Sequence, residues 1–313
     1  MPKLMEKFDL LRDLAAVNDM LASAHRSDPI GRLTFESRKQ MLEQRLAELE
    51  SEPERAVSVA LLFQGDPVFG SRAIDADFAT DAIRTFQEIV SKQFAEKTDG
   101  GLSESGRGIP FKELSALRIR SVAHGSFGFI LEERDPDQSE MFPTRLRETM
   151  DEVTDIIASF YSDREEDYLG SVDSINARVF NSVREFFGLL NKSNAALRLI
   201  EGERDEWIDR ERVTRAFERS SATQVEETED TLEGILVGVA PHEMRFEFKP
   251  DGQPDPVIGR SGPRISRNYL ERIEREGLML GSRFRAKIIT KTTKRPSGQV
   301  IRKHTFADLQ EIR

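Results

Sequence analysis

The sequence contains no cysteine, and its 313 residues include only four histidines, three tyrosines and one tryptophan. Without cysteine there can be no thiolate nucleophile, cysteine-ligated zinc, iron–sulfur cluster or thiol redox switch. The four histidines are far apart and form neither an H-x-x-x-H nor an H-E-x-x-H pattern. We therefore expect neither a metal centre nor a cofactor.

Long apolar runs are also missing. Residues 57–63 form one of the longest, which is the length of a strand and far short of the roughly 18 residues of a membrane span. Residues 1–21 alternate charged with apolar side chains and lack the continuous apolar core of a signal peptide. The sequence thus predicts a soluble, cytoplasmic protein that does not associate with membranes.

The sequence also lacks three common catalytic and nucleotide-binding motifs. It has no phosphate loop of the form G-x-x-x-x-G-K-[ST], no strand leading into G-x-G-x-x-G, and no G-x-S-x-G nucleophile elbow. These absences favour a binding protein over an enzyme, although they leave catalysis open.

The charge that is present is unevenly distributed. The formal net charge is −10, but residues 231–313 carry 16 Lys and Arg against 10 Asp and Glu, which leaves residues 1–230 with 30 against 46. An acidic body is therefore followed by a basic C-terminal part, and electrostatic partners must be considered for each part separately.

Residues 1–55 have the pattern of a helical hairpin. Apolar residues recur at helical spacing over residues 7–24 and again from Thr34 to Pro53, and a Pro and a Gly lie between the two segments. Each apolar stripe is narrow and surrounded by charge. The hairpin either packs on the domain that follows or mediates self-association or contact with a protein partner.

Residues 56–222 predict an acidic α+β domain. The spacing of apolar residues predicts strands and helices in the order β-β-α-β-β-α-α-β-α, with the last helix over residues 207–217. This order favours a mainly antiparallel sheet. Phenylalanine makes up 20 of the 24 aromatic residues, a bias typical of core packing because its ring has no polar group. A polar run at 223–231 then predicts a linker.

Residues 232–313 predict a small, basic β-barrel. Five strand-like segments are expected at 232–239, 244–248, 256–259, 284–289 and 300–306, with a helix at 265–276 between the third and the fourth. This is the element order of an OB-fold, a barrel that often binds oligonucleotides, and an SH3-like barrel fits nearly as well. Alternation places Phe246 and Phe248 on one face, which is more typical of a core than of a base-stacking platform.

Basic residues gather on the last two strands and the segment between them. Three alternate with apolar residues and should share an exposed face, and others lie in a loop expected at 291–299. Together they could bind an anionic partner, either nucleic acid or an acidic protein surface. Alternatively, they solubilise the barrel or dock it on the acidic body. The candidate residues are Arg283, Arg285, Lys287, Lys291, Lys294, Arg295, Arg302 and Lys303.

A pair of carboxylates offers the competing, catalytic interpretation. Asp75 and Asp77 lie where a strand is expected to meet a helix, and on a continuing strand they would share one face and could hold Mg²⁺ for phosphoryl transfer or nuclease chemistry. Asp77 is equally well placed to cap the helix. A third interpretation is a scaffold or regulatory subunit that binds only protein. We favour a non-enzymatic interaction protein whose basic barrel binds an anionic partner.

Overall fold

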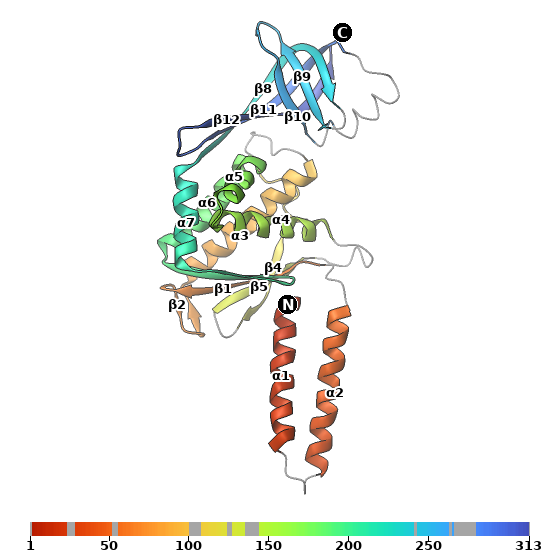
Figure 1. Cartoon of the computed structure of the whole chain (residues 1–313), viewed down its shortest axis with the longest axis vertical. Helices are drawn as coiled ribbons and strands as arrows, with labels where there is room; N and C mark the ends of the chain where they lie inside the picture. The colour runs from red at the N-terminus through yellow and green to blue at the C-terminus, as the bar shows by residue number, and fades with distance from the viewer. Residues whose placement is uncertain are drawn as a thin grey trace. The chain divides into compact units, whose positions relative to one another are not determined.

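The computed structural model describes residues 2–23, 29–51, 56–99, 108–123, 127–134, 144–240, 243–262, 265 and 280–312. These ranges contain seven helices and twelve strands in three sheets, so the chain is a mixed helix and sheet protein, as predicted (Figure 1). The helices are α1 (Lys3–Ser23), α2 (Pro29–Ser51), α3 (Ala76–Asp99), α4 (Arg145–Tyr161), α5 (Glu165–Ser174), α6 (Ala177–Lys192) and α7 (Arg210–Ala222). The strands are β1 (Ser58–Gly65), β2 (Val68–Phe69), β3 (Ala73–Ile74), β4 (Leu117–Ala123), β5 (Phe127–Glu133), β6 (Ala195–Glu201), β7 (Arg204–Ile208), β8 (Gln224–Ala240), β9 (Arg245–Pro250), β10 (Val257–Ser261), β11 (Arg283–Lys294) and β12 (Val300–Glu311).

The chain divides into two compact units, each assembled from separate stretches of sequence. The first unit contains Met1–Phe78, Ala116–Thr154 and Ser193–Arg210. The second contains Ala79–Ser115, Asp155–Lys192 and Glu211–Arg313. Helices α3 and α4 therefore each begin in the first unit and end in the second.

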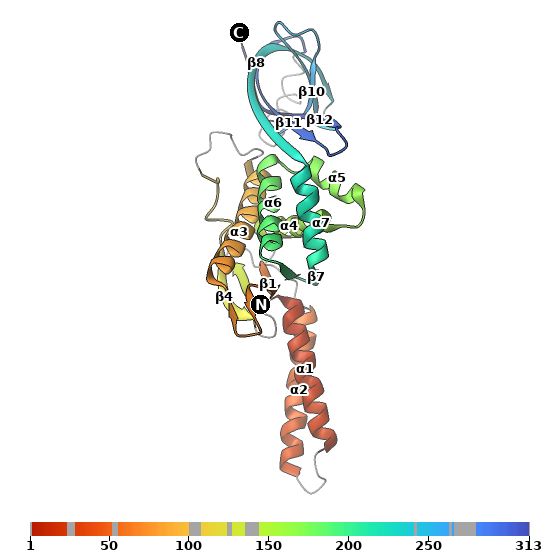
Figure 2. The same cartoon turned by 90° about the vertical axis from the view of Figure 1, so that its left-hand side faces the viewer.

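In the first unit, α1 and α2 lie side by side as the predicted hairpin (Figures 1 and 2). The less exposed apolar positions recur at intervals of three and four residues, and Val17 and Leu49 are buried. At the start of α1, the amide of Leu4 donates to the carbonyl of Gly202 at 3.3 Å, and Met5 packs beside Leu4 on a core cluster of the sheet. This contact fastens one end of the hairpin.

The main sheet of the first unit has the strand order β4-β5-β1-β6-β7, and every adjacent pair is antiparallel. The central strand β1 pairs on both sides, and residues 58–63 are all buried, so both faces of this strand are covered. The start predicted for the last helix of this domain, at Trp207, was wrong, because Trp207 belongs to the segment 204–208. It forms β7, in which Arg204, Glu206 and Ile208 are less exposed than their neighbours, and α7 begins only at Arg210.

The helices of the second unit are held together by aromatic side chains. The ring of Phe160 lies 5.4 Å from that of Tyr168, 5.7 Å from Phe180 and 6.2 Å from Phe187. All four residues are buried, and the Tyr168 hydroxyl donates to Thr223 Oγ1 at 2.9 Å. The predicted use of phenylalanine in a core is thus confirmed here, and Thr223 ties the end of α7 to α5.

Strands β8 to β12 pair in the cyclic order β10-β12-β11-β8-β9, and the pairing of β9 with β10 closes the barrel (Figure 2). The pair β10 and β12 is parallel, and the other four pairs are antiparallel. Phe246 and Phe248 point into the core, as alternation predicts. Of the predicted helix at 265–276, Ile265 lies in this core and the remaining residues lie outside the described ones.

The segment predicted to be a linker, residues 223–231, is instead almost wholly strand. Residues 224–231 form about the first half of β8 and pair with the last eight residues of β11, from Lys287 to Lys294. Val225, Glu227 and Glu229 are less exposed than the residues between them. The polar composition was misleading because carboxylates can occupy a strand when neighbouring strands and helices supply cations and amide groups.

None of the helices in the described ranges combines the length and the apolar character needed to cross a membrane.

The pairing of β5 with β1 leads to a stability prediction. Gly128 lies opposite Leu62, and a Cβ atom on it would fall 2.1 Å from the carbonyl oxygen of Leu61. We expect Gly128→Ala to lower the free energy of unfolding by more than about 2 kcal/mol, because the backbone of β1 must move. Gly170→Ala is the matched control, because nothing lies within 4 Å of its new Cβ and the helix should gain up to about 1 kcal/mol. Thermal unfolding followed by circular dichroism measures both, and equal midpoints would contradict the expected clash.

Candidate nucleic-acid interface

The two carboxylates considered for catalysis are both exposed and do not lie on one strand. Strand β3 ends at Ile74, and the amide of Asp75 donates to the carbonyl of Pro67 at 2.8 Å. Helix α3 then begins at Ala76, which places Asp77 in its first turn. Asp77 therefore does not precede the helix as a cap but still lies at the positive end of the helix dipole. In the part of the chain that the structure describes, no group of three or more His, Asp or Glu residues could hold a metal ion.

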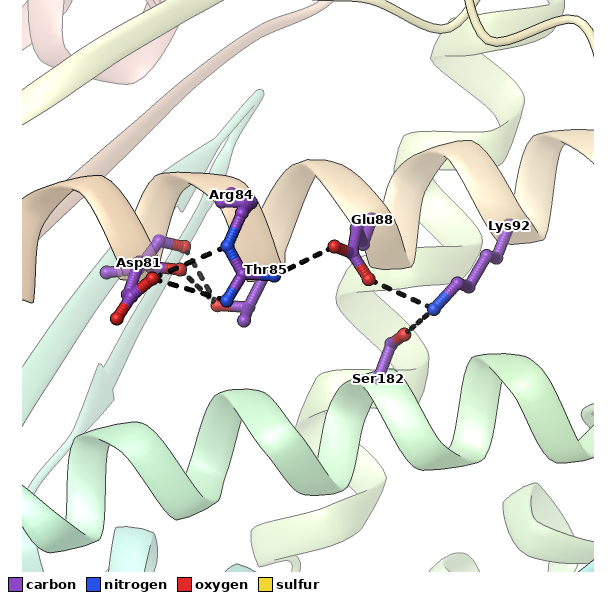
Figure 3. Close-up of polar contacts among 7 residues, drawn as sticks. Asp81, Arg84, Thr85, Glu88, Lys92 and Ser182 are labelled. Atoms are coloured by element: carbon purple, nitrogen blue, oxygen red, sulfur yellow. Dashed lines mark hydrogen bonds and ion pairs between the residues drawn. The ribbon is translucent and has the colours of Figure 1, made fainter. Parts of the chain in front are cut away.

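Further along α3, acidic side chains belong to a ladder of ion pairs (Figure 3). Arg84 contacts Asp81 at 3.2 Å and Glu88 at 2.9 Å, and Lys92 contacts Glu88 at 3.1 Å and donates to Ser182 Oγ on α6 at 2.6 Å. Burial raises the pKa of Glu88, but Lys92 and Arg84 outweigh it and hold that pKa below its ordinary value. These contacts join two helices and give the acids a structural role.

The cations on the outward face of β11 are neutralised by acids of the barrel itself. Arg283, Arg285 and Lys287 alternate with core residues, as predicted. Arg283 forms an ion pair with Asp251, Arg285 contacts Glu233 at 2.7 Å, and Lys287 contacts Glu229 at 2.8 Å. This face therefore carries little net charge.

The loop expected at 291–299 is shorter than predicted, because β11 continues to Lys294 and the connection to β12 spans only residues 295–299. Thr290, Thr292 and Thr293 suit a strand, and they pair with both β8 and β12. Lys291 consequently lies within a strand, where its side chain faces α5 and α6 of the same unit.

Lys291 is buried, with 8% of its surface exposed. Its ammonium group donates hydrogen bonds to the carbonyl oxygens of Val172 and Ile175, where α5 ends. Carbonyl groups at a helix C-terminus lack intrahelical partners and carry the negative end of the helix dipole, so a cation fits there. Burial lowers the pKa of Lys291 to about 8, against the opposing charges of Glu227 and Asp173.

Glu227 interacts with the opposite kind of helix end, the N-terminus of α6. It lies directly opposite Lys291 across the β8–β11 pair, and its Oε1 accepts a hydrogen bond of 3.0 Å from the amide of Ala177, the first residue of α6. Asn176 caps the same helix, because its Oδ1 accepts from the amide of Val179 at 2.8 Å. Burial raises the pKa of Glu227, partly offset by this backbone hydrogen bond. One cross-strand pair thus satisfies two helix ends of opposite polarity.

Two more of the predicted cations converge on Asp173 in α5. Arg295 Nη2 lies 3.3 Å and Lys303 Nζ 3.5 Å from Asp173 Oδ2, and Lys303 also donates to the Asp173 carbonyl at 3.2 Å. Of the eight candidate cations, three are therefore paired within the barrel and three contact the C-terminal end of α5 or the residue that follows it. Lys294 and Arg302 remain exposed, without an ion-pair partner among the described residues.

Strands β9, β10 and β12 and the α5–α6 turn line a groove of about 1060 Å³ within the second unit. Arg302 reaches it from β12, and Arg260 reaches it from β10, exposed and likewise without an ion-pair partner among the described residues. Met244 and Ile258 also line the groove, with 42% and 40% of their surfaces exposed. We call this the β10–β12 groove.

The chemistry of the β10–β12 groove suits anion binding. Its acidic lining residues are engaged by neighbours. Two cations contact Asp173, the amide of Ala177 donates to Glu227, the side-chain amide of Asn176 donates to Glu96 at 2.9 Å, and Arg245 lies 3.7 Å from Glu243. Burial, and then the charge of Arg302, holds the pKa of His304 below its ordinary value, so its ring is neutral at neutral pH. The available positive charge is therefore that of guanidinium groups, which bind phosphate in a bidentate manner.

The sequence did not point to Arg260, Met244 or Ile258. Arg260 directly follows the strand predicted at 256–259, and nothing in its local pattern distinguished it from the paired arginines nearby. The parallel pairing of Arg260 with Thr305 brings it to the strand that carries Arg302. That long-range pairing has no signature in the sequence.

The buried Lys291 predicts a particular pH dependence of stability. Because its pKa is about 8 when folded and near 10.5 when unfolded, the unfolded chain holds more protons between these values, and stability should rise with pH in this interval. Compared with Lys291→Met, the wild-type protein should gain on the order of 3 kcal/mol of unfolding free energy from pH 8 to pH 10.5. Urea unfolding at several pH values measures the difference, and parallel curves for the two proteins would show that Lys291 is not buried as a titrating group.

Comparisons with known proteins identify no relative: no protein-family model, no curated protein and no solved structure matches this chain.

Proposed function

We propose that the protein is a non-enzymatic nucleic-acid-binding protein, and that its barrel holds a single strand of nucleic acid in the β10–β12 groove. The observation that carries the proposal is the pair Arg260 and Arg302, which are exposed, lack ion-pair partners among the described residues and line the same groove from adjacent strands. Of the other cations considered for anion binding, Lys294 is also exposed without an ion-pair partner among the described residues but does not line the groove, and the rest are already paired.

The spacing of the two guanidinium groups supports contact with successive phosphates. Arg260 lies level with Thr305, so Arg302 lies three residues away along a parallel strand, or roughly 10 Å at about 3.3 Å per residue. Met244 and Ile258 add apolar surface beside them. No Phe, Tyr or Trp is among the described lining residues, so we expect affinity to come mainly from phosphates, with little base preference.

We further propose that the barrel is of the OB type. Two features support this over an SH3-like barrel. The first is the long segment between β10 and β11. The second is the parallel pairing of β10 with β12, because β12 then lies between β10 and β11 and the segment that connects these two strands must cross it. In OB-folds the second and third strands form the oligonucleotide-binding face. The equivalent strands here are β9, which contributes Arg245 to the groove, and β10, which contributes Ile258 and Arg260.

Fluorescence anisotropy with a labelled single strand of about 15 nucleotides, and with the matching duplex, tests the proposal at several salt concentrations. We expect the single strand to bind more tightly. The double variant Arg260→Gln/Arg302→Gln should weaken binding and reduce the slope of log K against log salt by about 1.4, because each lost phosphate contact removes about 0.7 on a single strand.

The matched control is Arg283→Gln/Arg285→Gln, which removes the same charge from cations that are paired with Asp251 and Glu233. It should leave the salt slope almost unchanged. The proposal would be refuted by an absence of binding at low salt, or by equal losses in the two double variants, since the second result would mean that net charge alone governs binding.

A further inference from the structure

A second surface, independent of the β10–β12 groove, lies on α1 in the first unit. Phe8, Leu11, Ala15, Asn18 and Ala22 recur at intervals of three and four residues, and all five are exposed. Phe8 and Leu11 have 50% and 40% of their surfaces exposed. At 100° per residue this stripe is centred roughly 120° around the helix from the residues that face α2. Helix α1 therefore carries two apolar seams, and α2 covers one.

The hairpin buries too little apolar surface to account for two long helices. Among the described side chains of α1 and α2, only Val17 and Leu49 are buried. Most of the stability of protein helices comes from packing of an apolar face, and an isolated helical pair with a second exposed apolar seam lacks part of that packing. The exposed stripe thus has the character of an interface.

From its charges we infer that a second copy of this chain covers the stripe, with its α1 antiparallel. Arg12 and Asp19 flank the stripe on the same side, one heptad apart, and both are exposed. A two-fold axis close to residues 15 and 16 places Arg12 of each copy opposite Asp19 of the other, because a two-fold interface repeats every contact. A parallel arrangement in register would instead bring identical charges to the same level.

Side-chain sizes agree with the antiparallel arrangement. The same axis brings Phe8 of one copy close to the level of Ala22 of the other, so that a large side chain meets a small one, and places the Ala15 residues of the two copies near each other. A single polar residue in an apolar seam restricts register, which gives Asn18 a role in setting this one. Two hairpins joined in this way form a four-helix bundle.

Light scattering during size-exclusion chromatography of the full chain tests the inference. The wild-type protein should elute at twice the chain mass, and Leu11→Glu should elute as a monomer with unchanged helix content by circular dichroism. Met41→Glu is the matched control, because Met41 is an apolar residue of α2 with 66% of its surface exposed but lies away from the stripe. It should remain dimeric, and a wild-type monomer at every concentration would overturn the inference.

A charge exchange tests the partner and the register. Arg12→Glu and Asp19→Arg should each raise the dimer dissociation constant about tenfold, because two ion pairs become repulsive contacts. The double variant should return close to the wild-type value, although it also lacks the contact of Arg12 with Asp9 within α1. A double variant weaker than both single variants, or an equal loss in Met41→Glu, would overturn the proposed pairing. Oligonucleotide binding at the β10–β12 groove should be unaffected in all of them, which separates this test from that of the proposed function.

Discussion

The structure of the second unit depends on one pair of opposite charges, Lys291 and Glu227, on adjacent strands of the barrel. Each would be costly to bury alone, since removing the partner of a buried charge typically costs 3–5 kcal/mol. Here each charge meets a helix end of opposite polarity, and hydrogen bonds to charged groups contribute about 1.5–3 kcal/mol each. Because α5 and α6 are joined by a short turn, both helix ends lie close enough for two neighbouring strands to reach them.

This arrangement explains why the net charge of the C-terminal part was a poor guide to its surface. Most of the basic residues on β11 and β12 and between them form ion pairs with carboxylates or donate hydrogen bonds to helix carbonyls, so they are not available to a ligand. Among the described residues, Arg260 and Arg302 keep unpaired positive charge and line one groove. A few unpaired guanidinium groups beside exposed apolar side chains define a site more sharply than a large but internally balanced charge does.

Much of the fold could be predicted from local patterns. The helical hairpin, the mainly antiparallel character of the sheet and the core position of Phe246 and Phe248 follow from local patterns, since apolar side chains must leave water together. The errors arose where tertiary contacts determine the secondary structure or the ion pairing of a residue. Residues 224–231 were read as a linker because they are polar, yet Glu227 is satisfied by an amide 50 residues away in sequence. Likewise, some cations of the predicted site are paired and others are not, and the contacts that decide this have no signature in the local sequence.

The length of β8 has a consequence for how the chain can be divided. Only Thr223 separates it from α7, and its first eight residues pair with β11. A fragment beginning at residue 232, where the basic barrel was predicted to start, would lose these eight residues and the carboxylate opposite Lys291. The last eight of the twelve residues of β11 would then lack their β8 neighbour. The natural edge of the barrel therefore lies at the end of α7 and not at the change in composition, so a truncation chosen by charge would cut through a strand rather than between domains.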